Sequence, residues 1–282
     1  METYAINIQG RLLSLAEPVV MGIINVTPDS FAVRCGSDDT EAVIMAAVRA
    51  VEEGAAILDV GAYSSRPGAA EVSAEEEWRR LSLALSAIRS RYPEIPLSVD
   101  TFRADIARRC VKEYGVGIIN DISGGELDEQ MFAAVAESGA AYVLMHMRGT
   151  PETMTSLTHY DEDIMSELFR YFAQRIDRLH ELGVKDIIID PGFGFAKTTE
   201  QNFELLRRLG ELRELGLPIL AGLSRKSMIY KTLSAAPDSA SALNGTTALN
   251  MMALRAGAKI LRVHDVREAA ETIKLYKALC LA

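Results

Sequence analysis

Short apolar runs that end in a polar residue recur along the chain, and each is followed by a loop and an amphipathic segment. The runs are apolar on both faces, which is typical of strands buried in a parallel sheet. We expect these strands at residues 19–24, 57–60, 97–99, 117–119, 142–145, 187–189, 219–223 and 260–263. Residues 4–8 and 11–15, joined by Gln9-Gly10, predict a hairpin before the first of them.

The segments between these runs carry signals for helix starts and helix ends. An acceptor stands three residues before an acid or amide, as in a capping box, at four places: Asp38 with Glu41, Ser73 with Glu76, Thr198 with Gln201, and Asp265 with Glu268. Glycines suited to a positive φ follow five helical patterns: Gly54, Gly139, Gly183, Gly216 and Gly257. After the helix start at Ser73, one helical face is apolar and should cover the sheet. It consists of Trp78, Leu81, Leu85 and Ile88.

About eight strand–helix units in 282 residues favour a closed barrel over an open, doubly wound sheet. No glycine-rich dinucleotide fingerprint follows the first strand, and no linker or low-complexity stretch interrupts the series. We therefore predict an α/β fold, a (β/α)₈ TIM barrel with a short N-terminal β-hairpin, as a single domain over residues 1–282.

Composition narrows the classes of partner. A net charge of −9 disfavours nonspecific nucleic-acid binding and favours small-molecule substrates. No apolar run approaches the roughly 18 to 20 residues that span a bilayer, and the first residues lack an export signal. Cys35, Cys110 and Cys280 show no paired spacing and should be reduced thiols. We expect a cytoplasmic protein that binds neither nucleic acid nor membrane.

Polar residues stand at nearly every strand exit, where barrel enzymes carry their catalytic groups. They are Asn25, Asp59, Asp100, Asn120, Asp121, His146, Asp190, Arg225, Lys226, Arg262 and His264. Core packing does not readily explain so many, because a buried polar group must find a partner. For any single residue a structural role remains open: an Asp can cap the next helix, and His146 lies within an apolar run typical of a core histidine.

The last exit, Arg262-Val-His264, places two side chains on the same side of the strand. This pattern favours an anion such as phosphate, to which Arg offers two parallel donors. The alternative is a salt bridge from this strand end to Asp265.

Two loops offer further polar groups. Residues 61–68 present hydroxyls and Arg66 beside Pro67 between glycines, as either a lid over phosphate or a plain surface turn. Residues 222–227 lead from a strand into a helix and carry Lys226, which is either a Schiff-base nucleophile or a hydrogen-bond donor. Ser227, at the helix start, could hold a carboxylate; a basic surface turn is the alternative.

Eight motifs stand in order over nearly the whole chain: MGIINVTPDSF at 21–31, DVGAYSSRPG at 59–68, SVDT at 98–101, INDISGG at 119–125, HMRGTP at 146–151, DPGFGF at 190–195, GLSRKS at 222–227 and RVH at 262–264. Taken together, they closely resemble the motifs of the dihydropteroate synthases. The resemblance implies that the amine of p-aminobenzoate displaces pyrophosphate from 6-hydroxymethyl-7,8-dihydropterin pyrophosphate during folate synthesis. It also implies a homodimer and a target of sulfonamides.

The resemblance also assigns binding residues. The pterin residues it implies are Asp100, Asn120, Ile122, Met145, Asp190, Phe195 and Lys226. The pyrophosphate residues are Asn25, Ser64, Arg66, Arg262 and His264, with Asn25 also a ligand of Mg²⁺. The p-aminobenzoate residues are Phe31, Ser65, Arg66, Pro67, Lys226 and Ser227. Asp100, Lys226 and Arg262 are the implied catalytic residues, with Asp100 stabilising positive charge on the pterin as its C–O bond breaks.

Two loops depart from the family pattern. Residues 32–36 read AVRCG where the family commonly has SDGG, so an acid is missing that Asp38 or Asp39 could replace. Ala62, Tyr63 and Ser65 stand where Gly, Glu and Thr are usual.

Three rival functions remain open at this point. One is a pterin-binding methyltransferase domain, which should lack the Ser-Ser-Arg-Pro-Gly and Ser-Arg-Lys-Ser motifs present here. Another is a metal-dependent hydrolase using Asp59, Asp100, His146, Asp190 and His264, although the first strand has no His-x-His pair. The third is a non-catalytic pterin-binding paralogue.

Overall fold

Eight parallel strands form one sheet in the computed structural model, which describes residues 4–26, 39–63 and 72–281. The strands are β3 (Val19–Asn25), β4 (Ile57–Gly61), β5 (Leu97–Asp100), β6 (Ile118–Asp121), β7 (Ala141–Met145), β8 (Ile187–Asp190), β9 (Leu220–Ala221) and β10 (Ile260–Val263). They are hydrogen-bonded in the order β8-β7-β6-β5-β4-β3-β10-β9. A bridge between Ile189 and Ile219 joins β8 to the start of β9, which closes the predicted TIM barrel.

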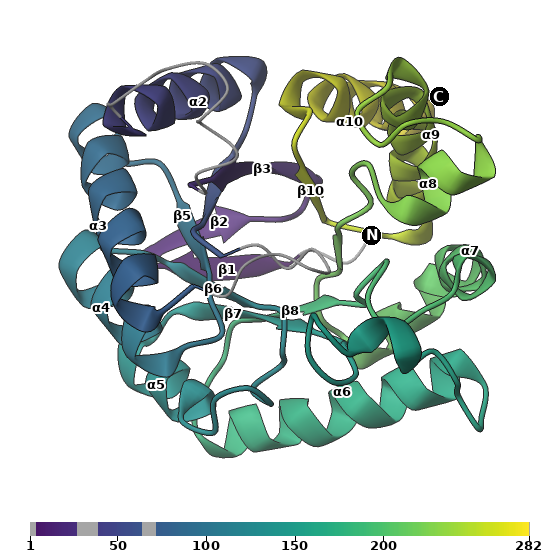
Figure 1. The fold of residues 1–282 in the computed structure, drawn as a ribbon, viewed down its shortest axis with the longest axis horizontal. Helices are drawn as coiled ribbons and strands as arrows, with labels where there is room; N and C mark the ends of the chain where they lie inside the picture. Colours follow the sequence, from purple (N-terminus) through teal and green to yellow (C-terminus); the bar gives the residue numbers. More distant parts are fainter. Residues whose placement is uncertain (1–3, 27–38, 64–71, 282) are drawn as a thin grey trace.

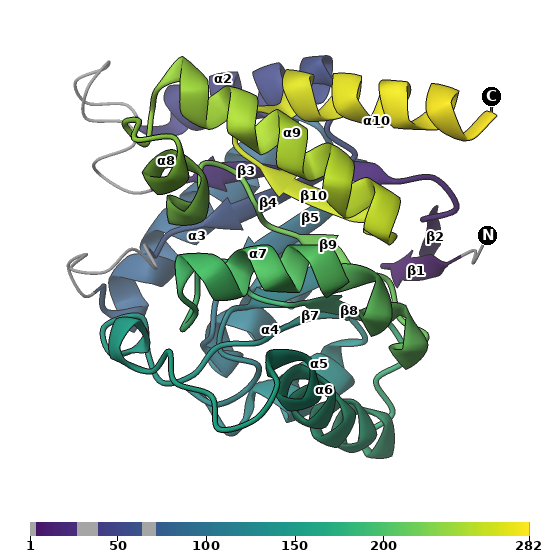
Figure 2. The same ribbon diagram turned by 90° about the vertical axis from the view of Figure 1, so that its right-hand side faces the viewer.

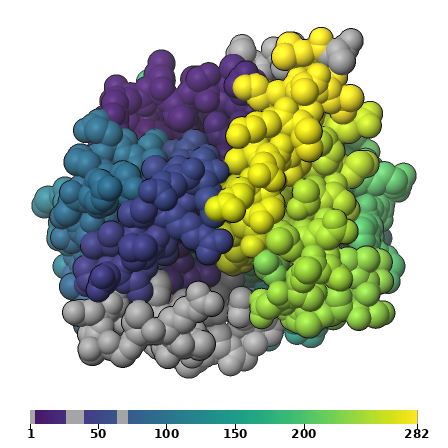
Figure 3. Space-filling view, turned by 90° about the horizontal axis from the view of Figure 1, so that it is seen from above, coloured from purple at the N-terminus to yellow at the C-terminus, as the bar shows by residue number. Residues whose placement is uncertain are grey.

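Helices surround the strands as an outer ring (Figure 1). They are α2 (Asp39–Glu53), α3 (Ala74–Arg91), α4 (Ala104–Tyr114), α5 (Met131–Ser138), α6 (Ile164–Glu181), α7 (Thr199–Arg208), α8 (Ser227–Thr232), α9 (Ala240–Ala256) and α10 (Val266–Leu281), with short 3₁₀ turns at Met154–Ser156 and Leu209–Leu215. On the outer surface α10 lies between α2 and α9, so segments from the two ends of the described chain lie side by side (Figure 3). None of the helices described is both long and apolar enough to cross a membrane.

Most of the predicted helix signals act as expected. Ser73 accepts a hydrogen bond from the backbone N–H of Glu76, and Thr198 and Gln201 form a reciprocal capping box. The five predicted glycines, Gly54, Gly139, Gly183, Gly216 and Gly257, all have φ between 64° and 107°. The predicted cap Asp265 uses its carboxylate to accept two donors from Arg225. Asp38 lies outside the described residues.

The seventh strand is shorter than residues 219–223, the range that the apolar run predicts. The strand β9 ends at Ala221, and the chain then turns toward α8 through Arg225, whose φ is +53°. Leu223 is still fully buried in the core, so its apolar character reflects burial in a turn and not continuation of the strand.

The predicted hairpin, β1 (Ala5–Ile8) paired with β2 (Arg11–Ser14), plugs the end of the barrel where the strands begin. Ile6, Ile8 and Leu15 are buried against the inward side chains of the strands. The contact at Gly117 is close: a Cβ there would lie 2.2 Å from Ile8 Cγ2. Figure 2 shows the hairpin at the end of the molecule opposite α8, so the other end holds the strand exits.

Candidate active site

The alternation of side chains along each strand builds a polar layer directly above an apolar floor. The floor inside the barrel consists of Met21, Ile57, Ile118, Val143, Ile188, Leu220 and Ile260. Two residues further along these strands stand Ile23, Asp59, Asn120, Met145, Asp190, Gly222 and Arg262. Four of these seven residues are polar or charged, so the barrel interior changes from apolar to polar within one step along its axis.

Arg262 links three strands at this level. Its Nε donates to Asp59 Oδ2 at 2.6 Å, and its Nη2 donates to Asp100 Oδ2 at 2.6 Å. Asn120 Nδ2 donates to the same oxygen of Asp59 at 3.0 Å. For Arg262 the sequence-based alternative, a salt bridge to Asp265, is wrong, because its carboxylate partners come from β4 and β5 while Asp265 pairs with Arg225.

Burial and neighbouring charges bring the pKa values of two groups close to physiological pH. Burial raises the pKa of Asp100 to about 7, an effect that Arg262 opposes and that Asp59 and Asp121 reinforce. Burial lowers the pKa of Lys226 to about 8, while Asp190 and Asp100 raise it. Two groups of opposite charge type that titrate close to neutrality at a barrel mouth are typical of an active site.

Burial would lower the pKa of Arg262, but Asp59 and Asp100 outweigh it and hold that pKa above its usual value. The guanidinium therefore stays charged and keeps further N–H groups for a ligand. A fixed cation at this depth suits an anionic leaving group.

An apolar wall faces the charged groups. Ile122, Met145 and Phe195 are buried in one cluster with Met147, Met154 and Ala196. The Lys226 ammonium lies 4.2 Å from the centre of the Phe195 ring, so the lysine and the apolar wall meet. Such a pocket, charged on one side and flat and apolar on the other, fits a polar heteroaromatic ring.

The turn that carries Lys226 is fixed by neighbours on both sides. Arg225 adopts the left-handed region, donates to both carboxylate oxygens of Asp265 at 2.9 Å, and its backbone N–H donates to Thr246 Oγ1. Ser224 Oγ lies 3.0 Å from His264 Nδ1. Lys226 then precedes α8, and Ser227 is its first residue, as the sequence predicts.

Two polar residues at strand exits are structural. The carboxylate of Asp121 accepts from the side chains of Ser123 and Tyr142 and from two backbone N–H groups. His146 is fully buried, with Nδ1 2.9 Å from Lys197 Nζ, and burial holds its pKa well below the usual value. This agrees with the core-histidine interpretation of His146.

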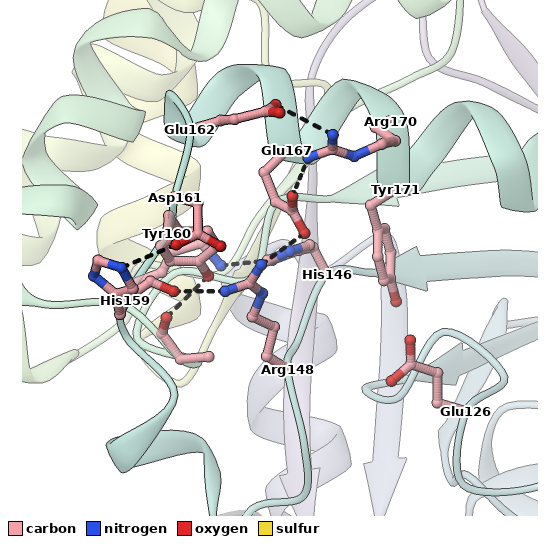
Figure 4. Close-up of polar contacts among 12 residues, drawn as sticks. Glu126, His146, Arg148, His159, Tyr160, Asp161, Glu162, Glu167, Arg170 and Tyr171 are labelled. Carbon is pink, nitrogen blue, oxygen red and sulfur yellow. Dashed lines mark hydrogen bonds and ion pairs between the residues drawn. The ribbon is translucent and has the colours of Figure 1, made fainter.

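Charged residues outside the mouth hold the loop that follows β7. Arg148 donates to the carbonyl of His159 and to Glu167 on α6, and Arg170 pairs with Glu162 and Glu167 (Figure 4). Tyr160 Oη donates to the carbonyl of Ala196, which ties this loop to the one after β8. These contacts support the loops that carry Met147 and Phe195, two members of the apolar cluster.

The structure describes only some of the other predicted binding residues. Asn25 is half-buried at the end of β3, and His264 is exposed just after β10. Phe31, Ser64, Ser65, Arg66 and Pro67 lie outside the described residues, as does the side chain of Asp39. Among residues 4–26, 39–63 and 72–281, no three His, Cys, Asp or Glu side chains are grouped to hold a metal.

Sequence reasoning gave Asp59 no part in the pterin or pyrophosphate site, although it named this strand exit and included Asp59 in a rival metal site. The two-residue period links Asp59 to Ile57 below it and could have placed it inside the barrel. Its partners Arg262 and Asn120 are 203 and 61 residues away, and no local pattern identifies them.

Comparison with known proteins gives consistent matches. Residues 21–264 match the model of the family described as "Pterin binding enzyme". The chain is 44% identical to the dihydropteroate synthase of Synechocystis, over 92% of this chain and 89% of that protein, and 42% identical to that of Escherichia coli, over 96% and 94%.

Solved structures agree. The dihydropteroate synthase of Xanthomonas albilineans with 4-aminobenzoic acid matches with a TM-score of 0.91 and 38% identity over the whole of both chains. The same enzyme in complex with 7,8-dihydropteroate matches with a TM-score of 0.88 and 36% identity, over 99% of this chain and 100% of that one.

Proposed function

Because the chain belongs to the dihydropteroate synthase family of pterin-binding enzymes, we propose that it joins 6-hydroxymethyl-7,8-dihydropterin pyrophosphate to p-aminobenzoate, releasing 7,8-dihydropteroate and pyrophosphate. The observation that carries the proposal is the polar layer around Arg262, which faces an apolar wall at the mouth of the barrel. We propose that residues 1–282 act as one pterin-binding domain.

The pterin binds between the charged side and the apolar wall. Asn120 and Asp190 offer acceptors to the N–H groups of the ring, and Lys226 donates to its oxygen and ring nitrogen. Ile122, Met145 and Phe195 cover its face. Asn120 and Asp190 are buried, which supports the assignment, because a missing hydrogen bond costs more where water is excluded.

The pyrophosphate binds at the end of β10. Arg262 donates to it from inside the barrel and His264 from the rim, and Ser64 and Arg66 complete the site. The amide oxygen of Asn25 is a ligand type that Mg²⁺ accepts, and few protein ligands are needed because the ion prefers phosphate oxygens and water. When bound, Mg²⁺ neutralises the developing charge of the leaving group.

The p-aminobenzoate site adjoins the pterin. Phe31, Ser65, Arg66 and Pro67 contribute to it, together with Lys226 and Ser227. Ser227 stands at the first position of α8 with its side chain beside the helix start, which suits the carboxylate of the ligand.

The reaction needs a stabilised leaving group more than a strong base. The lone pair of the neutral arylamine forms the new C–N bond, the C–O bond of the hydroxymethyl group breaks, and pyrophosphate departs with its electrons. The amine proton is lost to solvent. Arg262 stabilises the leaving anion, and Asp100 in its ionised form stabilises positive charge that spreads into the pterin.

We further propose that the enzyme is a cytoplasmic homodimer and a target of sulfonamides. Large apolar side chains exposed on α9 and α10, Met252, Leu275 and Leu279, support a contact between copies. Sedimentation of the purified protein across a range of concentrations tests the dimer.

A coupled assay of pyrophosphate release tests the activity. Release should require both substrates and Mg²⁺, and omission of p-aminobenzoate should abolish it. A protein that binds the pterin and releases no pyrophosphate would be a non-catalytic paralogue instead.

A further inference from the structure

One buried carboxylate contacts the pocket only through other residues. Asp59, on β4, has no exposed surface. Its Oδ2 accepts from Asn120 Nδ2 at 3.0 Å and from Arg262 Nε at 2.6 Å. Both donors belong to the proposed site, one for the pterin and one for the pyrophosphate.

This carboxylate determines which way the Asn120 amide faces. An ionised carboxylate can only accept hydrogen bonds, so the NH₂ group of Asn120 must point toward Asp59. The carbonyl oxygen of the same amide then points away from Asp59. Asn120 is thereby presented to a ligand as an acceptor, which suits a ring that carries N–H groups.

The same oxygen fixes the guanidinium of Arg262. Asp59 holds Nε and Asp100 holds Nη2, so two carboxylates from adjacent strands define the plane of the group. The remaining N–H groups have one orientation available to meet an anion. A planar cation held on two sides loses little further conformational entropy when it binds.

Packing alone does not account for an acid at this position. Burying a carboxylate is costly unless it is paired, and the floor just below Asp59 is apolar throughout. We propose that Asp59 is a positioning residue, which orients the Asn120 amide for the pterin and the Arg262 guanidinium for the pyrophosphate. The inference rests on the proposed function.

The chain offers a matched control for testing this. Ser98 is paired with Asp59 in register on the neighbouring strand, is fully buried, and its Oγ has no hydrogen-bond partner among the described residues. Asp59→Asn should lower kcat/KM for dihydropterin pyrophosphate by about tenfold or more, because a hydrogen bond to a charged group is lost. Ser98→Ala should leave it nearly unchanged, although both variants alter a buried polar side chain.

A double-mutant cycle separates positioning from a general loss of structure. If Asp59 acts through its two partners, Asp59→Asn should cost clearly less in an Asn120→Ala or an Arg262→Ala background than in the wild type. A purely structural role predicts the same loss in every background. Thermal unfolding of each variant checks that it is folded. Asp59→Ser, which keeps an acceptor without charge, serves the same cycle if Asp59→Asn fails to fold.

Failure of the positioning role and failure of the proposed activity give different results. Equal kcat/KM for Asp59→Asn and Ser98→Ala, or additive losses in both cycles, would overturn the positioning role while the wild type remains active. If the wild type forms no product, the proposed activity fails. Calorimetric affinity for 6-hydroxymethyl-7,8-dihydropterin then replaces kcat/KM in the Asn120 cycle, with the same two outcomes.

Discussion

At the scale of single residues, the proposed chemistry depends on groups whose charge is set by their surroundings. Asp100 and Lys226 share the barrel mouth with Arg262, yet burial moves their pKa values toward each other, to about 7 and about 8. The proposed mechanism needs Asp100 ionised and Lys226 protonated. We therefore expect activity to be highest between these two pKa values.

The pH dependence of kcat/KM tests this arrangement, since it reports groups of the free enzyme. Activity should rise as Asp100 ionises near pH 7 and fall as Lys226 loses its proton near pH 8. The groups facing Asp100 are Arg262, which lowers its pKa, Asp59 and Asp121, which raise it, and Lys226, which lowers it. Removing the charge of Arg262 should therefore move the acidic limb to higher pH. A flat profile across this range would contradict the assigned roles.

Arg262→Ala should discriminate between ligands. The pyrophosphate-bearing pterin should lose roughly 2 to 5 kcal/mol of binding free energy if the contact is well desolvated. The unphosphorylated hydroxymethyl-dihydropterin should lose far less. Calorimetry with both ligands measures the difference, and Arg267→Ala, an exposed arginine on α10, is the control. Equal losses for both ligands would assign Arg262 another role.

Lys226→Ala should weaken pterin binding without unfolding the protein, because Lys226 contributes donors to the pocket and no core volume. Lys231→Ala, an exposed change on α8, the helix that follows Lys226, should affect neither binding nor melting temperature. Unchanged pterin affinity together with a large loss of stability would contradict the assignment of Lys226 to the pterin site. Trapping of a covalent adduct on Lys226 by borohydride would favour Schiff-base chemistry.

The sequence identifies individual site residues better than it identifies their partners. Asp100, Asn120, Asp190 and Arg262 could be predicted because polar residues that end apolar runs stand out. The pairing of Arg262 could not, because Asp265 is near in the chain, while Asp59 becomes near only when β10 pairs with β3, whose other neighbour is β4. Long-range pairing depends on barrel closure, which local patterns do not contain.

At the scale of elements, strand length and turn geometry explain where sequence patterns succeed and fail. All eight predicted strands lie within two residues of the observed bounds at each end, as expected for boundaries set by local pattern. The seventh strand is shortened because apolar Leu223 is buried from a turn and not from the sheet. The five glycine caps were predictable because a positive φ needs no long-range information.

The hairpin should matter for stability and not for catalysis. Ile8→Ala removes a buried side chain from the floor of the barrel and should lower the free energy of unfolding by about 2 to 5 kcal/mol. Its kcat should stay near the wild-type value, because the hairpin plugs the end opposite the site. Leu12→Ala, 77% exposed on the same hairpin, is the control for thermal unfolding. A large fall in kcat for folded Ile8→Ala would show that the two ends are coupled.

At the scale of the whole molecule, a chain of net charge −9 is proposed to bind a pyrophosphate ester. The barrel places Arg262 and Lys226 inside one mouth, where Asp59 and Asp100 hold the Arg262 guanidinium in place and leave it further N–H groups for an anion. Fold and family were predictable from the whole chain, because eight different family motifs occur in order, one at each of the eight strand ends. Residues 27–38 and 64–71, which carry much of the proposed p-aminobenzoate site, lie outside the described residues.

The most direct test of the account is the product itself. Purified enzyme supplied with dihydropterin pyrophosphate, p-aminobenzoate and Mg²⁺ should form 7,8-dihydropteroate and pyrophosphate in equal amounts, quantified by mass spectrometry and phosphate analysis. Asp100→Asn should form both far more slowly while remaining folded. Pyrophosphate release without dihydropteroate, or no product from folded wild-type enzyme, would contradict the central claim that this barrel mouth condenses the two substrates.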